Sequence, residues 1–206
     1  MRAILLKKFI SLFMLILFLI TQYVGADRTY VQSQYTTTNQ GQTLYVGGDG
    51  PGNYSTIQNA INDAYDGCII FVYQGTYYEH IEVDKSINIT GENRENTIIN
   101  NPDSDENVVF INKENCVING FTIQNSGISR DGILTISDET IIYDCIIKSN
   151  DESGIDISDS NNNDIFNCIF IDNTWGIELN GWDAPIEATS INNCTFYQEK
   201  GFGILL

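Results

Sequence analysis

The chain has 206 residues, of which 27 are acidic and 10 basic, giving a formal net charge of −17 at pH 7. This excess of negative charge repels nucleic acid and anionic lipid, so we expect neither as a partner. The chain is long enough, and at 42% hydrophobic residues apolar enough, to form one domain with a substantial core.

Residues 1–26 have the layout of a secretory signal peptide. Arg2, Lys7 and Lys8 precede the apolar run "FISLFMLILFLI", and small residues in "TQYVGA" follow at the spacing of a cleavage site. The run is short for a helix that spans a bilayer, and an uncleaved N-terminal anchor is the alternative. We expect the rest of the chain to be secreted or on the cell surface, without membrane insertion after cleavage, and residues 27–42 to form an N-terminal extension.

Residues 43–85 are expected to form an N-terminal cap and the first coil of the fold. In "NYSTIQNAINDAYDG", apolar residues recur at the spacing of an amphipathic helix, with Gly67 as its stop. Ser55 and Gln58 have the spacing of a capping box, which places the N-cap of this helix at Ser55. The segments "CIIFVY", "HIEVD" and "INITG" that follow are predicted to be strands.

Residues 86–206 contain a repeat with a period in the low twenties. The motif Ile-x-x-[Phe/Cys]-x-[Ile/Phe] occurs four times, at spacings of 24, 23 and 26 residues. The copies are Ile118–Phe121–Ile123, Ile142–Cys145–Ile147, Ile165–Cys168–Phe170 and Ile191–Cys194–Phe196. Gly-Ile pairs recur at Gly132, Gly154, Gly176 and Gly203. Such a period is typical of a solenoid, in which each unit buries its apolar side chains against its neighbours.

The pattern inside a unit indicates a solenoid of strands. Short segments rich in Ile, Val, Thr and Phe alternate with period two and are separated by Asn, Asp, Ser and Gly. The repeats show no helical periodicity, which argues against leucine-rich or helical repeats. We therefore predict an all-β solenoid, a single-stranded parallel β-helix with coils about 4.8 Å apart, a short N-terminal capping helix and an uncapped C-terminal end. Because the chain stops within a new unit, "GFGILL", we expect further coils or domains beyond residue 206.

Cys145, Cys168 and Cys194 occupy one inward column of the predicted coils. Free buried thiols that pack as small hydrophobic groups are the favoured interpretation. A disulfide or a metal site is the alternative, although parallel Cβ vectors suit a disulfide poorly. His80 is the only histidine, which leaves few imidazole or soft ligands for a metal.

The cap resembles the opening of pectinesterases. The matching residues are Tyr54-x-Thr56-Ile57-Gln58-x-Ala60-Ile61, Gly75-x-Tyr77-x-Glu79, Asp84-Lys85 and Gly91. Over residues 43–206 the chain is similar to the right-handed, pectin-lyase-like β-helix superfamily, and most of all to its NosD-like, carbohydrate-binding and sugar-hydrolase repeats. The resemblance implies a right-handed coil, whereas the activity stays open because one fold carries many functions.

The sequence lacks the catalytic motifs of this superfamily. It has no Gln-Ala-x-Ala-Leu, Asp-Phe-Ile-Phe-Gly or Gly-Arg-Pro-Trp segment of pectinesterases, and no Asp-Asp, Gly-His-Gly or Arg-Ile-Lys element of polygalacturonases. The resemblance therefore transfers no catalytic residue. Enzymatic activity is left open, with a non-enzymatic role favoured.

Asp156 in "GIDI" and Glu178 in "GIEL" are expected at equivalent outward positions of successive coils, about 4.8 Å apart along the stack. Such a pair of carboxylates could bind Ca²⁺ or act in retaining glycoside hydrolysis. A solvated row of acids on an acidic protein is the favoured alternative. Apart from this Ca²⁺, no cofactor is predicted.

The fourth repeat contains an insertion around "NGWDAP", which predicts a longer loop. Trp182, with Asp183 and Trp175 nearby, could offer an aromatic platform and polar groups to a sugar ring. The alternative is that a Trp here covers a corner of the coil. These three are the predicted ligand-binding residues.

Together these features predict a secreted or cell-surface β-helix repeat protein that binds glycans or acts as an adhesion or envelope module. Its predicted partners are polysaccharides or glycoprotein glycans, and downstream domains of the same chain. The alternative is a polysaccharide-acting enzyme, a lyase, hydrolase or esterase, whose catalytic coils lie beyond residue 206. A purely structural role in a surface layer is a third possibility.

Overall fold

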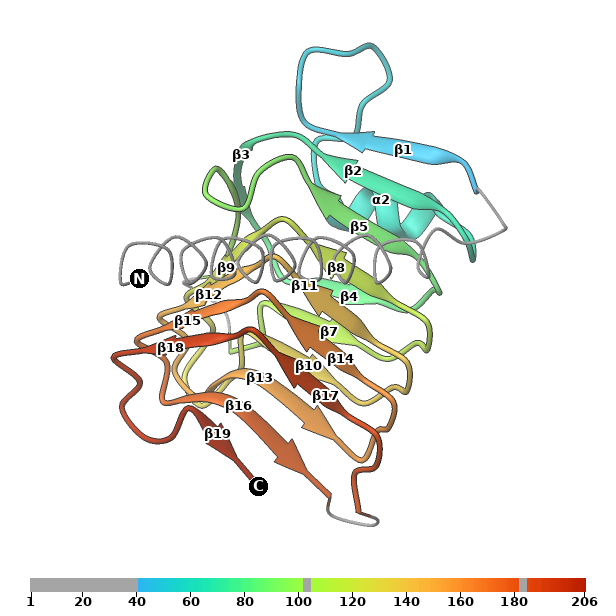
Figure 1. The fold of residues 1–206 in the computed structure, drawn as a ribbon. Coiled ribbons are helices and arrows are strands. Elements are labelled where there is room, and N and C mark those ends of the chain that lie inside the picture. The colour runs from blue at the N-terminus through green and yellow to red at the C-terminus, as the bar shows by residue number, and fades with distance from the viewer. Residues whose placement is uncertain (1–40, 102–104, 182–184) are drawn as a thin grey trace, which may run out of the picture. The chain divides into compact units, whose positions relative to one another are not determined.

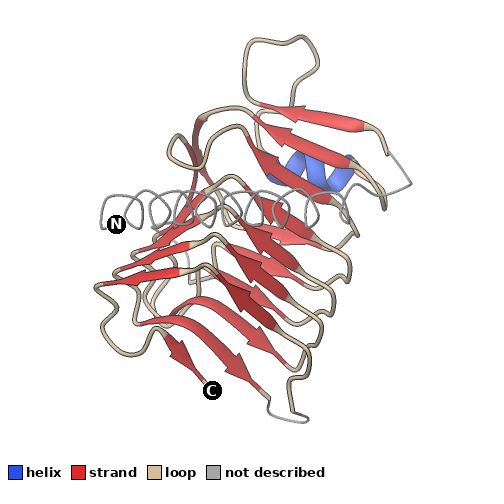
Figure 2. Cartoon of the chain, viewed as in Figure 1, coloured by secondary structure: helices blue, strands red, loops and turns tan. Residues whose placement is uncertain are grey.

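The computed structural model describes residues 41–101, 105–181 and 185–206. These residues form a stack of β-strand coils with one helix at the N-terminal end (Figure 1, Figure 2). No helix within these ranges is long and apolar enough to cross a membrane. The predicted signal peptide, residues 1–26, and nearly all of the predicted extension, residues 27–42, lie outside the described residues.

Three parallel sheets, here called sheets A, B and C, form the walls of the coils. Sheet A contains β1 (Thr43–Val46), β2 (Ile69–Val72), β5 (Asn88–Gly91), β8 (Val117–Asn119), β11 (Ile141–Tyr143), β14 (Asp164–Phe166) and β17 (Ser190–Asn192). Sheet B contains β3 (Gly75–Tyr78), β6 (Thr97–Asn100), β9 (Thr122–Gln124), β12 (Ile146–Lys148), β15 (Ile169–Ile171) and β18 (Thr195–Tyr197). Sheet C contains β4 (Ile81–Val83), β7 (Val109–Ile111), β10 (Ile133–Thr135), β13 (Ser153–Ser158), β16 (Trp175–Asn180) and β19 (Ile204–Leu205). The chain passes through A, B and C in turn, which confirms the predicted parallel β-helix.

The residues aligned in the repeat lie in register through the stack. In sheet A, Ile142 pairs with Ile118 on one side and with Ile165 on the other. The last column of the motif pairs in the same way in sheet B and consists of Ile123, Ile147, Phe170 and Phe196. The first three members of both columns are at most 1% exposed. These columns therefore form the core, as the repeat predicts.

The predicted cysteine column also lies inside the coils. Cys145 and Cys168 are buried and Cys194, in the last described coil, is half-buried, all three with free thiols. The thiol of Cys168 contacts those of the coils above and below it, and these contacts raise its pKa above the ordinary value. The cysteines thus fill a narrow inward position, as small apolar residues do.

From β7 onward, the corners of the coils contain residues with a left-handed backbone. Between sheets A and B these residues include Asp144, Asn167 and Asn193; between sheets B and C they include Asn125, Ser149, Asp172 and Gln198; and between sheets C and A they include Asn115, Glu139, Asn162 and Ala188. Among non-glycine residues, Asn and Asp adopt this conformation most readily. This preference explains why Asn and Asp recur between the apolar segments of the sequence.

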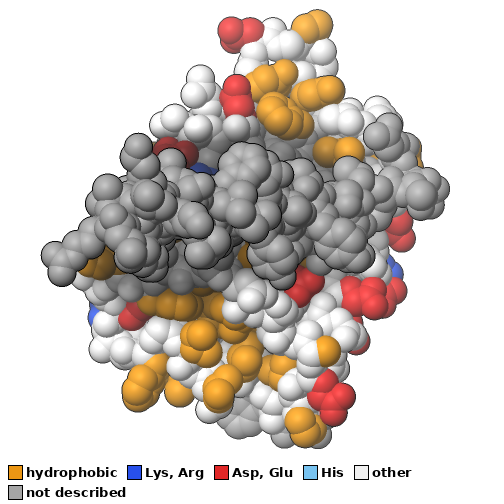
Figure 3. All heavy atoms as spheres, viewed as in Figure 1, with side chains coloured by type: hydrophobic (Ala, Val, Ile, Leu, Met, Phe, Trp, Pro, Cys, Tyr) orange, Lys and Arg blue, Asp and Glu red, His pale blue; other side chains and the backbone are white. Residues whose placement is uncertain are grey.

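Aromatic side chains lie on the outer face of sheet A. Tyr143 and Phe166 stack with ring centroids 4.9 Å apart and an interplanar angle of 4°. Tyr45, Phe71 and Tyr73 form a second group nearer the N-terminal cap. Figure 3 shows hydrophobic side chains near β1 and β2 and over the last coils. These rings are half-buried or exposed, so they lie outside the core.

The helix of the cap, α2 (Ile57–Asp63), begins one residue later than predicted. Its N-cap is Thr56, whose Oγ1 accepts a hydrogen bond from the backbone N–H of Asn59 at 3.2 Å. The predicted capping box of Ser55 and Gln58 is therefore wrong. The Gln58 side chain instead hydrogen-bonds the backbone of β4, on the next coil.

The first turn of α2 receives a second cap from the neighbouring coil. The carboxylate of Glu79 accepts hydrogen bonds from the backbone N–H groups of Ile57 at 2.8 Å and Gln58 at 3.0 Å. A carboxylate in this position satisfies unpaired donors and complements the positive end of the helix. The helix ends at Asp63, and Gly67, with φ of 91°, lies in the turn before β2 rather than at the helix end.

Replacing Thr56 with alanine is expected to lower the free energy of unfolding by about 1 kcal/mol, because the N-cap hydroxyl satisfies an otherwise unpaired backbone N–H. The matched control is Ser55→Ala, expected to change it by less than about 0.5 kcal/mol, since Ser55 is exposed and not the N-cap. Urea denaturation followed by circular dichroism measures both. A larger loss of stability in the Ser55 variant than in the Thr56 variant would show that the helix begins where the sequence predicts.

Candidate functional site

Strands β13 and β16 bring together the two carboxylates singled out in the sequence. Asp156 pairs in register with Glu178 on the next coil. Ile155 and Ile157, on either side of Asp156, are fully buried. Alternation along the strand therefore turns Asp156 to the outer face of sheet C, where its side chain is half-buried. Glu178 occupies the same outward position in β16.

Neutral side chains hold both carboxylates in place. Asn180 Nδ2 donates to both carboxylate oxygens of Asp156 at 3.1 Å, and Ser158 Oγ donates to Oδ1 at 2.9 Å. Ser153 Oγ donates to Oε2 of Glu178 at 2.7 Å. Because an ionised carboxylate has about four acceptor sites, these bonds fix the two groups and leave acceptor sites for a ligand.

A third carboxylate, which the sequence prediction missed, belongs to Asp131. Only 8% of Asp131 is exposed, and its Oδ1 accepts a hydrogen bond from the backbone N–H of Ser153 at 2.9 Å. Asp131 directly precedes Gly132, as Ser153 directly precedes Gly154. Aligning the residues before the Gly-Ile pairs, as well as those after them, would have revealed this position.

Burial and mutual repulsion raise the pKa values of these carboxyl groups. The pKa of Asp131 is raised to about 7, chiefly because burial removes water from the charged form and further because three other acids lie nearby. The pKa of Asp156 is raised to about 6, again chiefly by burial. The pKa of Glu152 is raised by burial and by Glu178. We call these four residues the sheet C carboxylate cluster: Asp131, Glu152, Asp156 and Glu178.

The cluster has no ion pair with a lysine or arginine of the described residues. The ion pairs in this part of the chain join Lys85 to Asp84, and Arg94 to Glu95 and Asp144. The same residues contain no group of three or more His, Cys, Asp or Glu side chains arranged to hold a metal ion. Ca²⁺ binding at Asp156 and Glu178 stays a prediction.

The chemistry of the cluster follows from its pKa values. Near neutral pH a carboxyl group with a pKa of about 7 is present in both its protonated and its ionised form. It can therefore donate a hydrogen bond as an acid or accept one as a carboxylate. A group of this kind beside other carboxylates suits both hydroxyl recognition and proton transfer.

Two of the three predicted ligand-binding residues, Trp182 and Asp183, lie outside the described residues. The third, Trp175, begins β16 and pairs with Ser153 of β13. Its half-buried indole lies close against Gly201 of the next coil. A Cβ added at Gly201 would be 2.6 Å from the indole Nε1. Trp175 therefore covers the corner between sheets B and C, and the aromatic platform at Trp182 stays a prediction.

Pectin methylesterases are among the solved structures that have a similar fold. The carrot enzyme has a TM-score of 0.62 and 21% identity, with 78% of this chain and 54% of that enzyme covered. The Aspergillus niger enzyme has a TM-score of 0.59 and 17% identity, with coverages of 78% and 57%. PemA of Erwinia chrysanthemi has a TM-score of 0.51 and 12% identity, with coverages of 69% and 56%.

These likenesses concern the fold. The chain spans little more than half the length of each enzyme, and the identities are low. The structural likenesses confirm the resemblance of the fold to pectinesterases. Among curated proteins, no sequence matches this chain. The sequence model of the family described as "Right handed beta helix region" matches residues 80–206. Because this match covers more than half of the sequence, the chain belongs to the right-handed β-helix family.

Proposed function

We propose that the protein is an extracytoplasmic β-helix that binds a polysaccharide along the outer face of sheet C. The observation that carries this proposal is the in-register pair Asp156 and Glu178, with their hydrogen-bonding partners on the same strands. Groups that repeat once per coil suit a linear polymer, which presents hydroxyl groups along its whole length. The signal-like sequence of residues 1–26 supports the location.

Apolar side chains extend the same outward column toward the N-terminal coils. Phe110 pairs with Leu134, and Leu134 pairs with Asp156, so the column reads Phe, Leu, Asp and Glu on successive strands. Binding sites for small organic ligands combine apolar side chains with a few placed polar groups. Sugar rings have apolar C–H faces and polar edges, so this mixed column favours a carbohydrate.

A glycan array tests the proposal with the full chain and the double variant Asp156→Asn/Glu178→Gln. We expect the wild-type chain to be retained on at least one class of polysaccharide. The double variant should bind it at least about tenfold more weakly, since a hydrogen bond to a charged group contributes about 1.5 kcal/mol or more.

The matched control is Asp49→Asn/Glu114→Gln, which removes the same charge from two exposed loop positions. It should bind as the wild-type chain does. No retention of the wild-type chain, or equal retention of the Asp156/Glu178 variant, would contradict the proposal. Trp182→Ala on the same array tests the aromatic platform predicted from the sequence.

A second candidate function, cleavage of a polysaccharide, is favoured by the pKa of about 7 at Asp131. Glycosidases pair a protonated carboxyl group of raised pKa, the general acid, with an ionised carboxylate. Release of new reducing ends from a bound polysaccharide would support this function if Asp131→Asn abolished it. Retention without any cleavage would leave binding as the function of this face.

A further inference from the structure

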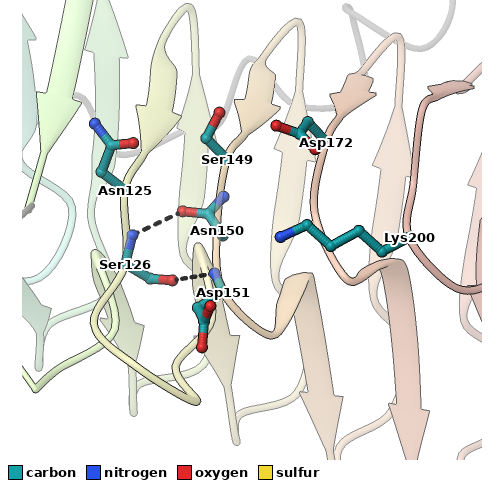
Figure 4. A pocket seen from close by; sticks show the side chains of 7 residues that line it. All are labelled: Asn125, Ser126, Ser149, Asn150, Asp151, Asp172 and Lys200. Carbon is teal, nitrogen blue, oxygen red and sulfur yellow. Dashed lines mark hydrogen bonds between the residues drawn. The ribbon is translucent and has the colours of Figure 1, made fainter.

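A polar groove lies at the corner between sheets B and C, and its volume is about 450 Å³ (Figure 4). We call it the B–C groove. It is lined by Asn125, Ser126, Ser149, Asn150, Asp151, Asp172 and Lys200. These residues follow β9, β12, β15 and β18, so the groove crosses four successive coils. No aromatic or aliphatic residue is among those that line it.

The floor of the groove is held by hydrogen bonds between coils. The backbone N–H of Ser126 donates to Asn150 Oδ1 at 3.1 Å, and the backbone N–H of Asp151 donates to Ser126 Oγ at 2.9 Å (Figure 4). Asn150 is fully buried, and its Nδ2 donates to Asn173 Oδ1 at 3.0 Å. The floor is therefore fixed in position before any ligand arrives.

The rim of the groove has polar groups that remain available. Ser149, Asp172 and Lys200 are exposed, and within the described residues their side chains make no hydrogen bond or ion pair. Lys200 extends over the groove toward Asn150 (Figure 4). The three side chains come from successive coils and supply a hydroxyl, a carboxylate and an ammonium group.

These groups indicate the class of ligand. A carboxylate accepts hydrogen bonds, an ammonium donates them, and a hydroxyl does both, which complements neighbouring sugar hydroxyls. The lining has two carboxylates, Asp151 and Asp172, against one ammonium, so its net charge disfavours a polyanion. The lack of apolar residues in the lining disfavours a lipid or an aromatic ligand.

We propose that the B–C groove binds a sugar unit of an uncharged polysaccharide through Asp172, Lys200 and Ser149. Asp151 lines the groove, and Glu152 beside it belongs to the sheet C carboxylate cluster, so the two sites adjoin along the chain. The inference rests on the proposed function, because the groove and sheet C would bind the same polysaccharide. The groove thereby selects neutral chains over uronate chains.

The test titrates the full chain with neutral linear hexasaccharides of glucose, galactose, mannose and N-acetylglucosamine. A galacturonate hexasaccharide serves as the anionic comparison. We expect one neutral hexasaccharide to bind more tightly than the galacturonate, and to shift the backbone amide resonances of Ser126 and Asp151. Asp172→Ala/Lys200→Ala should weaken this binding at least tenfold without changing the thermal melting temperature by more than a few degrees.

The matched control is Glu139→Ala/Lys113→Ala, which removes one acid and one lysine at the corner between sheets C and A. It should bind like the wild-type chain.

If a neutral hexasaccharide binds, but the groove variant binds it equally well and the amide resonances do not shift, the groove inference is wrong and the proposed function stands. If the groove variant loses binding while Asp156→Asn/Glu178→Gln keeps it, the groove stands and the sheet C proposal fails. Binding of the galacturonate alone overturns the groove inference, and no binding at all overturns both.

Discussion

Replacing Asp131 with asparagine is expected to stabilise the protein by about 4 kcal/mol at pH 8, since the pKa of Asp131 is raised by about three units and each unit corresponds to about 1.4 kcal/mol. The folded state raises the pKa of Asp131 from 3.8 to about 7, chiefly because only a small part of the residue reaches water. Asparagine carries no charge to bury, and its side-chain oxygen can still accept the hydrogen bond from Ser153.

The gain should depend on pH in a defined direction. Between about pH 4 and pH 7 the folded chain binds a proton at Asp131 that the unfolded chain has released. The stability of the wild-type protein therefore falls as the pH rises through this window, and the variant does not share this loss. Below pH 4 the carboxyl group of Asp131 is protonated in both the folded and the unfolded chain. The wild-type protein and the variant should then differ little in stability.

Urea unfolding from pH 4 to pH 8.5 measures this difference. Asp49→Asn is the control, because it removes the same charge from an exposed loop position. It should show no comparable gain at high pH. A variant at Asp131 that is less stable than the wild-type chain at pH 8, or equally stabilised at every pH, would show that burial of the ionised carboxylate is not the cause.

Phe170→Ala is expected to lower the free energy of unfolding by about 3 to 5 kcal/mol, which is the usual loss for a large aromatic side chain deleted from a core. Phe170 is fully buried and stacks on Phe196 of the next coil, with ring centroids 4.9 Å apart. Each coil of a solenoid is stabilised mainly by its neighbours. The cavity left by Phe170 would therefore weaken the contacts of its own coil with the coils on both sides.

Phe166→Ala provides the matched control, because it deletes the same side chain from the outer face of sheet A. Phe166 stacks on Tyr143 but remains half-buried. The Phe166→Ala variant should therefore lose only about 1 kcal/mol of the free energy of unfolding. Denaturant titration of both variants gives the comparison. Similar losses at the two positions would mean that the inward column does not form the core of these coils.

The sequence predicts the columns of the β-helix because they depend only on spacing. Ile142, Cys145 and Ile147 lie where the repeat places them, since strand alternation and a regular period determine which side chains point inward. The outward register of Asp156 and Glu178 follows from the same periodicity. The fold is thus largely predictable without any knowledge of individual contacts.

Contacts between coils were much harder to predict. The hydrogen bonds from Ile57 N–H to Glu79 and from Ser153 N–H to Asp131 each join residues 22 positions apart, one coil along the stack. No local motif marks such pairs. The N-cap was misplaced by one residue because Ser55 and Thr56 both carry a hydroxyl, and only the extended backbone of Thr56 decides between them. The B–C groove likewise depends on turns from four coils and has no counterpart in a single repeat.

The matched register of the coils has an evolutionary consequence. Ile118, Ile142 and Ile165 occupy one equivalent position, so in-frame loss of residues 142–164 would bring Ile118 against Ile165 and preserve the pairing of sheet A. Duplication of the same gene segment would add a coil with equal ease. A lineage could therefore lengthen or shorten the surface that faces a polymer in whole-coil steps, without having to invent a new fold.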